Sequence, residues 1–358
     1  MRSLLRYCAT LVLATAACAV LVAQPARASM GLSTLPGPAE DQRTTVFYPS
    51  DSPPANVQRG VFRFEAAVKG SPIPGNRRLI VISHGSGGSP WSMVDLARVL
   101  VDAGFVVAMP DHEGDNWHDH RKVGPDSWKL RPTEVSQAID AVARDAQLGP
   151  LLDTRQVGVY GMSAGGLTAL AMAGGRWSPG NFKRHCVDHM QDDFAACVGL
   201  LTQLRGNFLD PVKLQVARWV HRLRFDDDTW QAHTDPRVKA AVANVPMAAP
   251  FDMDSLARPP IPLGLVTAGQ DQWLVPRFHS DRVLAACTSC ETIASLPQAG
   301  HASLLSPWPA ELTAEFNPLM VRLMTDPPGF DRQVLPGVYD KIAAFFTRHL
   351  LAPATAGQ

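Results

Sequence analysis

The sequence has few charged residues and no excess of either sign. Only 18% of its 358 residues are Asp, Glu, Lys or Arg, and 33 basic residues balance 33 acidic ones. Hydrophobic residues make up 46% and aromatic residues 7%, and no internal repeat or low-complexity block occurs. This composition excludes a disordered, collagenous or coiled-coil chain and a strongly basic nucleic-acid-binding protein. The chain is expected to fold as one large domain.

Long hydrophobic runs are also scarce. The one that stands out, residues 7–23, follows Arg2 and Arg6 and precedes Ala26-Arg27-Ala28, which has the small-x-small form of a cleavage site. Residues 1–28 are therefore predicted to be a secretory signal peptide, and residues 29–358 a secreted or periplasmic protein. A retained membrane anchor is one alternative and lipidation at Cys18 is another.

Removal of that segment would change the charge of the chain. It deletes three arginines and no acid, which leaves 30 basic and 33 acidic residues, a net charge of −3. Nucleic acid and anionic membrane surfaces are therefore not expected partners, and stable membrane insertion is not expected either.

Cysteine is rare. Of six cysteines, Cys8 and Cys18 lie in the predicted signal peptide, so an even four remain. In an exported protein these are expected to form disulfides, and the simplest of the three possible connectivities pairs residues 186 with 197 and 287 with 290. A zinc site is the alternative, but the two pairs lie far apart and the first lacks zinc-knuckle spacing.

Apolar runs alternate with amphipathic helical patterns along the chain. This alternation predicts an α/β fold with a mostly parallel central sheet flanked by helices. Central strands are expected at 78–83, 105–109, 156–160, 238–245 and 263–266, and edge strands at 44–48 and 60–68. Helical spacing recurs at 93–100, 135–142 and 338–346.

One long stretch, residues 174–234, interrupts the alternation. It is predicted to be an inserted, mainly helical cap, with Asp210 as the N-cap of a helix that has Pro211 at its first position. The disulfide between residues 186 and 197 would staple this cap. The alternative is a surface excursion remote from any site.

The motif Gly161-Met162-Ser163-Ala164-Gly165 follows the expected strand at 156–160 and precedes a helix-compatible segment. Glycines at these places allow a sharp turn that exposes the serine hydroxyl at the end of the strand. In this context GxSxG predicts that Ser163 is a nucleophile.

A serine that attacks an acyl carbon also needs N–H donors for the negative charge on the carbonyl oxygen. The glycine-rich loop 84–88 follows another expected strand, where such a donor is needed. The backbone N–H groups of Ser86 and Ala164 are the predicted oxyanion hole.

The nucleophile further requires a histidine base and an acid that orients it, in the chain order Ser, acid, His. His301, on a loop after a strand-like segment at 292–296, is the predicted base. His279 is interpreted as structural and His349 as a charge at the C-terminal end of a helix. Asp271, just after the strand at 263–266, is the predicted acid. Asp252 and Asp254 remain competitors.

His112, His118 and His120 crowd the loop 111–120, which raises the possibility of a metal site. The loop lacks the helical HExxH spacing, and a serine triad needs no metal, so it is interpreted as a polar active-site loop.

With these residues in place, residues 43–350 resemble the serine α/β-hydrolases of the dienelactone-hydrolase-like group, in its secreted branch related to platelet-activating-factor acetylhydrolases and bacterial polyester hydrolases. The matching blocks are VISHGSGGS, MPDHEGDN, RPTEVSQAIDAV, YGMSAGGLTA, DPRVKAAVANVP and PLGLVTAGQD. The resemblance implies the α/β-hydrolase fold and hydrolysis of carboxylic esters through an acyl-enzyme without a cofactor. Ser163 departs from dienelactone hydrolase proper, which uses cysteine.

The sequence thus predicts a serine esterase or lipase-like enzyme that acts on a small-molecule or lipid-like ester. An amidase or peptidase with the same triad is the alternative within enzymes. A catalytically inactive hydrolase fold that serves as a binding module is the alternative from another class, although all three triad positions are occupied.

Overall fold

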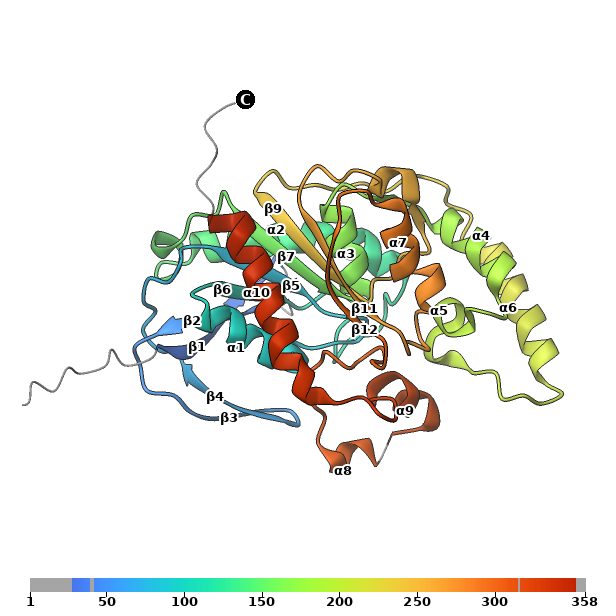
Figure 1. The fold of residues 1–358 in the computed structure, drawn as a ribbon, viewed down its shortest axis with the longest axis horizontal. Coiled ribbons are helices and arrows are strands. Elements are labelled where there is room, and N and C mark those ends of the chain that lie inside the picture. The colour runs from blue at the N-terminus through green and yellow to red at the C-terminus, as the bar shows by residue number, and fades with distance from the viewer. Residues whose placement is uncertain (1–27, 39–41, 315, 352–358) are drawn as a thin grey trace, which may run out of the picture.

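A ten-stranded sheet forms the centre of the molecule. The structure is a computed structural model that describes residues 28–38, 42–314 and 316–351, so nearly all of the predicted signal peptide lies outside the described residues. Six strands run parallel in the order β12-β11-β9-β7-β5-β6 (Figure 1). They are β5 (Leu79–Ser83), β6 (Val106–Pro110), β7 (Val157–Met162), β9 (Val238–Asn244), β11 (Leu263–Ala268) and β12 (Glu291–Leu296). The predicted mostly parallel sheet is confirmed.

The sheet continues beyond β6 as a largely antiparallel extension. The strands β2 (Arg43–Ser50), β1 (Ser29–Pro36), β4 (Phe62–Val68) and β3 (Ala55–Arg59) follow in that order. The two predicted edge strands are present as β2 and β4, but neither lies at an edge, because β2 is between β6 and β1, and β4 is between β1 and β3. β1 and β3 were not predicted. β3 has one buried residue among five, so it carries no alternation of apolar and polar positions that a sequence pattern could reveal.

Helices cover both faces of the sheet. α1 (Val94–Asp102) and α10 (Leu335–Leu351) pack with Ile80 and Ile82 of β5, while α2 (Pro125–Arg144) and α3 (Ala164–Met172) pack with Leu79 and Val81. Successive side chains of a strand point to opposite faces of the sheet. Since helices cover both faces, all the side chains of β5 are buried, which explains its unbroken apolar run.

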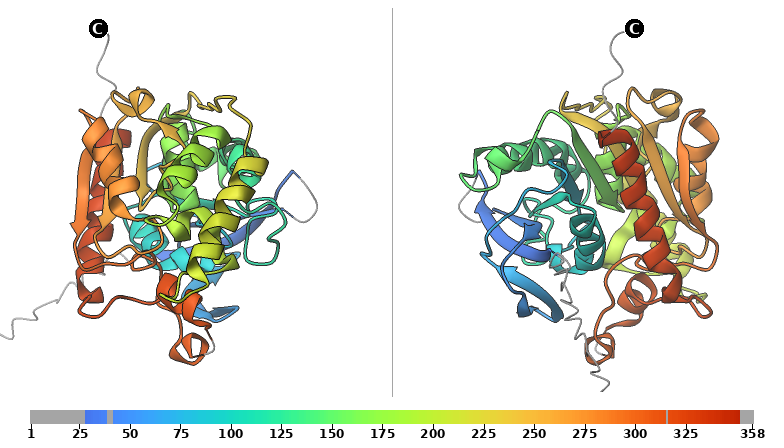
Figure 2. Two further views of the ribbon diagram at one scale, coloured as in Figure 1. Left: turned by 90° about the vertical axis from the view of Figure 1, so that its right-hand side faces the viewer. Right: turned by 60° about the vertical axis from the view of Figure 1, so that its left-hand side comes forward.

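The stretch predicted to form a cap contains three helices, α4 (Pro179–His189), α5 (Phe194–Val198) and α6 (Asp210–Arg224). They lie at the opposite end of the molecule from β1–β4 (Figures 1 and 2). The stretch also holds β8 (Arg176–Trp177), an unpredicted short strand that pairs with β10 (Phe251–Asp252).

The predicted N-cap at Asp210 is wrong. α6 begins at Asp210 itself, with Leu209 in the N-cap position. The Asp210 carboxylate instead accepts hydrogen bonds from the backbone N–H groups of residues 205–207 in the preceding loop. The side chain therefore orders the approach to the helix, as short acidic side chains commonly do in turns.

The remaining elements are short. They are α7 (Ser280–Ala286), α8 (Ala310–Thr313) and α9 (Pro318–Met324), together with 3₁₀ helices at Pro90–Met93, Gly149–Leu151, Gly199–Leu201, Met253–Leu256, Pro276–Phe278 and Arg332–Val334. Disulfides join Cys186 to Cys197 and Cys287 to Cys290, as predicted. In the part of the chain that the structure describes, no helix is both long and apolar enough to cross a membrane.

Candidate active site

Ser163 occupies the turn between β7 and α3. Its φ is 58° and its ψ is −116°, a backbone conformation that costs a non-glycine residue on the order of 1–3 kcal/mol. Two hydrogen bonds hold this turn. The Ser163 N–H donates to the Asn244 carbonyl at 3.1 Å, and the Ser163 carbonyl accepts from the Met247 N–H at 3.0 Å. The end of β9 thus supports the strained serine.

Glycines make the turn possible. A Cβ atom on Gly161 would lie 1.8 Å from the carbonyl oxygen of Gly165, and one on Gly165 would lie 1.8 Å from that of Ser83. Both distances are far below van der Waals contact with a rigid backbone. The two outer positions of the GxSxG motif must therefore be glycine for α3 to approach the ends of β7 and β5.

Three side chains predicted from the sequence form one chain of hydrogen bonds. His301 Nε2 lies 2.9 Å from Ser163 Oγ, and His301 Nδ1 lies 2.7 Å from Asp271 Oδ2. With the proton of a neutral ring on Nδ1 and donated to Asp271, Nε2 is free to accept the serine hydroxyl proton. Each of the three residues is at most 8% exposed. The structure therefore brings together the predicted nucleophile, base and acid.

The acid and the base stand on loops that follow neighbouring parallel strands. The loop after β11 joins the loop after β12 through hydrogen bonds from Gly269 N–H to the Leu296 carbonyl and from Gln270 N–H to the Ala299 carbonyl, each 2.9 Å long. The second carboxylate oxygen of Asp271 accepts the backbone N–H groups of residues 273 and 274, both at 2.8 Å. These contacts fix the direction in which the carboxylate faces His301.

The competing acids lie elsewhere. Asp252, in β10, forms a salt bridge of 2.6 Å with Arg176, and Asp254 is exposed on the short helix that follows. His279 contacts Asp193, and His349 lies near the end of α10 beside Phe345. None of these residues has a hydrogen bond to Ser163 or His301 in the described structure.

The predicted oxyanion loop, residues 84–88, lies directly beside the nucleophile. A Cβ atom on Gly85 would be 3.4 Å from the Cβ of Ser163. The Asp115 Oδ1 atom accepts the Ser86 hydroxyl at 2.6 Å and the Gly87 N–H at 2.8 Å, which orders the loop. Ser86 and Ala164 therefore stand on the two segments that adjoin Ser163.

A completely buried ion pair lies behind this loop. Arg131 donates to Asp115 Oδ2 at 2.8 Å and to the His84 carbonyl at 2.5 Å, and neither charged side chain is exposed to solvent. Burial opposes ionisation of Asp115, but the Arg131 charge and the hydrogen bond from Ser86 outweigh it and lower the pKa of this carboxyl to about 2. Asp115 is thus a fixed anion that anchors the predicted oxyanion loop.

The loop 111–120 provides a second buried contact to the same region. His112 Nε2 lies 2.8 Å from the hydroxyl of Ser83 and its Nδ1 lies 2.5 Å from Glu134. Burial holds the pKa of His112 well below its usual value, so this ring is neutral. Because both ring nitrogens are engaged by protein groups, His112 has no lone pair left for a metal.

Sequence reasoning interpreted loop 111–120 as part of the site, but it did not identify Arg131 and Glu134. Arg131 and Glu134 lie on the same face of α2 as the buried Val135 and Ala138, at intervals of three and four. A charged residue on an apolar face needs a partner, because an unpaired buried charge is very costly. That pattern was a visible signal for a buried polar network.

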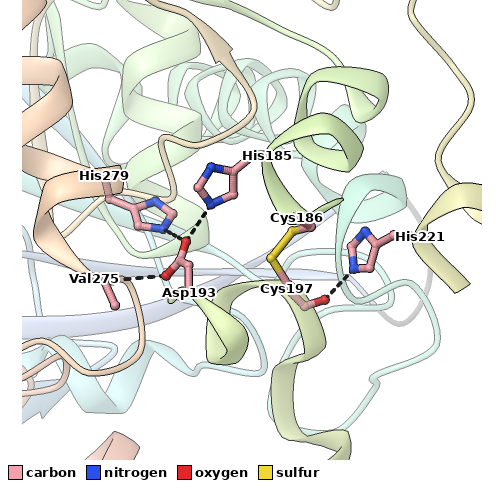
Figure 3. The surroundings of a disulfide bond; sticks show 7 residues. All are labelled: His185, Cys186, Asp193, Cys197, His221, Val275 and His279. Atoms are coloured by element: carbon pink, nitrogen blue, oxygen red, sulfur yellow. Dashed lines mark hydrogen bonds and ion pairs between the residues drawn. A yellow bond between two sulfur atoms is a disulfide. The ribbon is translucent and has the colours of Figure 1, made fainter. Parts of the chain in front are cut away.

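One cluster of potential metal ligands is found among the described residues, and it consists of His185, Asp193 and His279 (Figure 3). Both imidazole Nε2 atoms approach Asp193 Oδ2, at 2.8 and 2.9 Å. His279 Nδ1 accepts the Ala248 N–H at 3.0 Å, so the ring proton sits on Nε2 and faces the carboxylate. To bind a metal here, His279 would need the lone pair of Nε2, but that atom carries the proton. The cluster therefore fits a hydrogen-bonded latch between the predicted cap and the core better than a metal site.

The geometry can be compared with known proteins. The sequence pattern of the prolyl oligopeptidase family matches residues 91–204, about a third of the chain. Among curated proteins, none matches the sequence. A ferulic acid esterase from Streptomyces cinnamoneus is similar in structure, with a TM-score of 0.59 and 19% sequence identity over 94% of each chain. Together with the parallel sheet, its flanking helices and the turn at Ser163, these similarities show that the chain has the α/β-hydrolase fold.

Proposed function

We propose that this protein hydrolyses carboxylic esters through an acyl-enzyme on Ser163, with His301 as general base and Asp271 as the acid that orients it. The observation that carries the proposal is the continuous hydrogen-bond chain from Ser163 Oγ through His301 to Asp271. The ferulic acid esterase with the same fold supports an ester as the substrate class.

The reaction follows from the positions of these atoms. Ser163 Oγ attacks the acyl carbon while His301 Nε2 takes its proton. The developing oxyanion accepts hydrogen bonds from the backbone N–H groups of Ser86 and Ala164. His301 then returns the proton to the departing alcohol, which leaves the acyl group on Ser163. A water molecule, deprotonated by His301, attacks the acyl carbon and releases the acid and free serine. These steps require no metal or cofactor.

A peptidase or amidase with the same three residues is the second candidate. It is favoured by the match of residues 91–204 to the prolyl oligopeptidase family, a segment that contains Ser163 but neither Asp271 nor His301. The chemistry differs chiefly in the leaving group, since an amide nitrogen departs less readily than an ester oxygen and depends more strongly on the proton that His301 returns. Matched p-nitrophenyl esters and p-nitroanilides of the same acyl groups separate the two, and we expect the esters to be cleaved and the anilides not to be cleaved measurably.

A fluorophosphonate probe tests the proposal itself. It should label the protein once, and peptide mapping should place the label on Ser163. The Ser163→Ala variant should not be labelled. Labelling of another residue would contradict the proposed role of Ser163. No labelling of the folded protein would contradict it too and would favour an inactive binding module.

Export through cleavage after residue 28 is part of the proposal and is tested by N-terminal sequencing of the secreted protein.

A further inference from the structure

An exposed apolar stripe runs along the outer face of α6. Val212, Val216, Trp219 and Leu223 recur at intervals of four, three and four residues, so they share one face of the helix. Each of them is more than half exposed. The loop before the helix extends the stripe with Phe208, which is 86% exposed. In Figure 2 (left), the side of the molecule that carries α4 and α6 faces the viewer.

The opposite face of α6 is the one that packs on the protein. Leu214 and Ala217 pack against the hydrophobic core, and the buried His221 forms a hydrogen bond of 2.8 Å with the carbonyl of Cys197. The helix therefore has two apolar faces, one of which faces solvent. Isolated exposed apolar residues are ordinary, but a continuous stripe that includes tryptophan marks an interaction surface.

Cations border the stripe. At 100° per residue, Arg222 lies on one side of the stripe and Arg224 on the other, about 60° and about 80° from the nearest stripe residue, whereas Arg218 lies toward the packed face near Leu214. None of these three arginines forms a salt bridge within the described ranges. The acids that follow the helix, residues 226–228, are paired with cations of α2 and α4 instead. Asp210, the acid within the helix, is paired with Lys213.

We propose that this face of α6, defined by residues 208, 212, 216, 219 and 223 together with Arg222 and Arg224, docks on an anionic phospholipid surface. A helix with an apolar stripe that contains tryptophan, bordered by arginines, lies in the plane of a membrane interface. There the apolar side chains enter the boundary of the acyl chains, and the arginine stems extend along it so that their guanidinium groups reach lipid phosphates.

The same charges disfavour a second copy of the chain as the occupant. A twofold interface through the stripe would pair this face with itself, and the face offers no unpaired acid to the arginines that flank it. The net charge of the chain argues against anionic partners, but charge is unevenly distributed, and the α6 face is cationic. The proposed contact is peripheral, since no described helix can span a membrane.

Vesicle flotation tests this proposal. The protein should float with phosphatidylcholine vesicles that contain phosphatidylglycerol, and much less with phosphatidylcholine alone. Val216→Glu should reduce the bound fraction at least about tenfold, because a charge replaces an apolar side chain in the lipid boundary. Val334→Glu is the matched control, since Val334 is 45% exposed outside the stripe, and its binding should be unchanged.

Two further variants separate the contributions. Arg222→Gln combined with Arg224→Gln should remove most of the preference for phosphatidylglycerol and its sensitivity to salt. Ser163→Ala should float like the unmodified protein, so the outcome does not depend on the proposed hydrolase activity. Equal flotation of the Val216→Glu and Val334→Glu variants, or no flotation at all, would overturn the proposal. A dimer that Val216→Glu dissociates in sedimentation velocity would overturn it in favour of a second copy.

Discussion

Asp115 and Arg131 form a salt bridge of 2.8 Å in which neither side chain is exposed, directly behind the loop that carries Ser86. The pair comes from two distant elements, the loop after β6 and the middle of α2. Through Asp115 it reaches Ser86 and Gly87, and through Arg131 the carbonyl of His84. The conformation of the proposed oxyanion loop therefore depends on one buried ion pair.

Replacement of Asp115 by Asn should lower kcat by about 10²-fold with a smaller effect on KM, because a displaced oxyanion donor acts chiefly in the transition state. It should also lower the free energy of unfolding by about 3–5 kcal/mol, since Arg131 would be left buried without a counter-charge. Steady-state kinetics on the folded variant and urea unfolding measure the two effects.

The control is Asp153→Asn, which breaks a partly exposed pair with Arg78 and should leave kcat unchanged. A destabilised Asp115→Asn variant with normal kcat would show that the pair serves the fold alone.

Asp271→Asn should lower kcat by about 10⁴-fold, because the amide no longer holds His301 in the tautomer that accepts the serine proton. Asp252→Asn is the matched control, and its effect on kcat should be slight, since Asp252 pairs with Arg176. Ester hydrolysis by the two variants measures the difference. If the losses were reversed, the acid would belong to the segment after β9.

Loss of the cap disulfide should alter substrate selection more than the stability of the sheet. The bond joins α4 to α5, next to Asp193, whose second oxygen lies 3.4 Å from the Val275 N–H on the loop that carries Asp271 (Figure 3). The double variant Cys186→Ser, Cys197→Ser should therefore change KM and the preference for acyl chain length. Profiling with esters of graded length measures this, with Cys287→Ser, Cys290→Ser as the control pair outside the cap. An identical profile in both double variants would leave the cap without a role in selection.

The latch around Asp193 should weaken in acid. Burial opposes ionisation of Asp193, but hydrogen bonds from His185 and His279 outweigh it and lower its pKa to about 2. Because the folded pKa lies below the unfolded value of about 3.9, the anion adds about 2 kcal/mol of stability above pH 4, and this is lost as the pH falls toward 2. The difference in unfolding free energy between the protein and its Asp193→Asn variant should therefore shrink from pH 5 to pH 2, which urea unfolding at each pH measures. A difference that is constant across this range would contradict a latch that depends on the ionised form.

Much of the fold was predictable because its signals are local. The strands around residues 79–83 and 157–162 are buried on both faces, so their unbroken apolar runs mark them without knowledge of their neighbours. The turn at Ser163 was predictable for a similar reason, since the glycines that it requires lie only two residues to either side.

The features that were not predicted depend on contacts between distant segments. Arg131 and Asp115 are 16 residues apart, and Asp193 and His279 are 86 apart, so no local pattern indicates either pairing. The short strand β8 is likewise defined by its partner β10 rather than by its own two residues. Such pairings are fixed by the packing of the whole molecule.

The kinetic effect of Ser163→Ala tests the central claim most directly. The substitution removes one oxygen atom at a site where the backbone is already fixed by Asn244 and Met247, so unfolding should be nearly unchanged. Removal of the nucleophile should lower kcat for ester hydrolysis on the order of 10⁶-fold. Measured with a p-nitrophenyl ester on the folded variant, that loss is the result we predict. A variant that retained more than a few per cent of the original activity would contradict the assignment of Ser163 as the nucleophile.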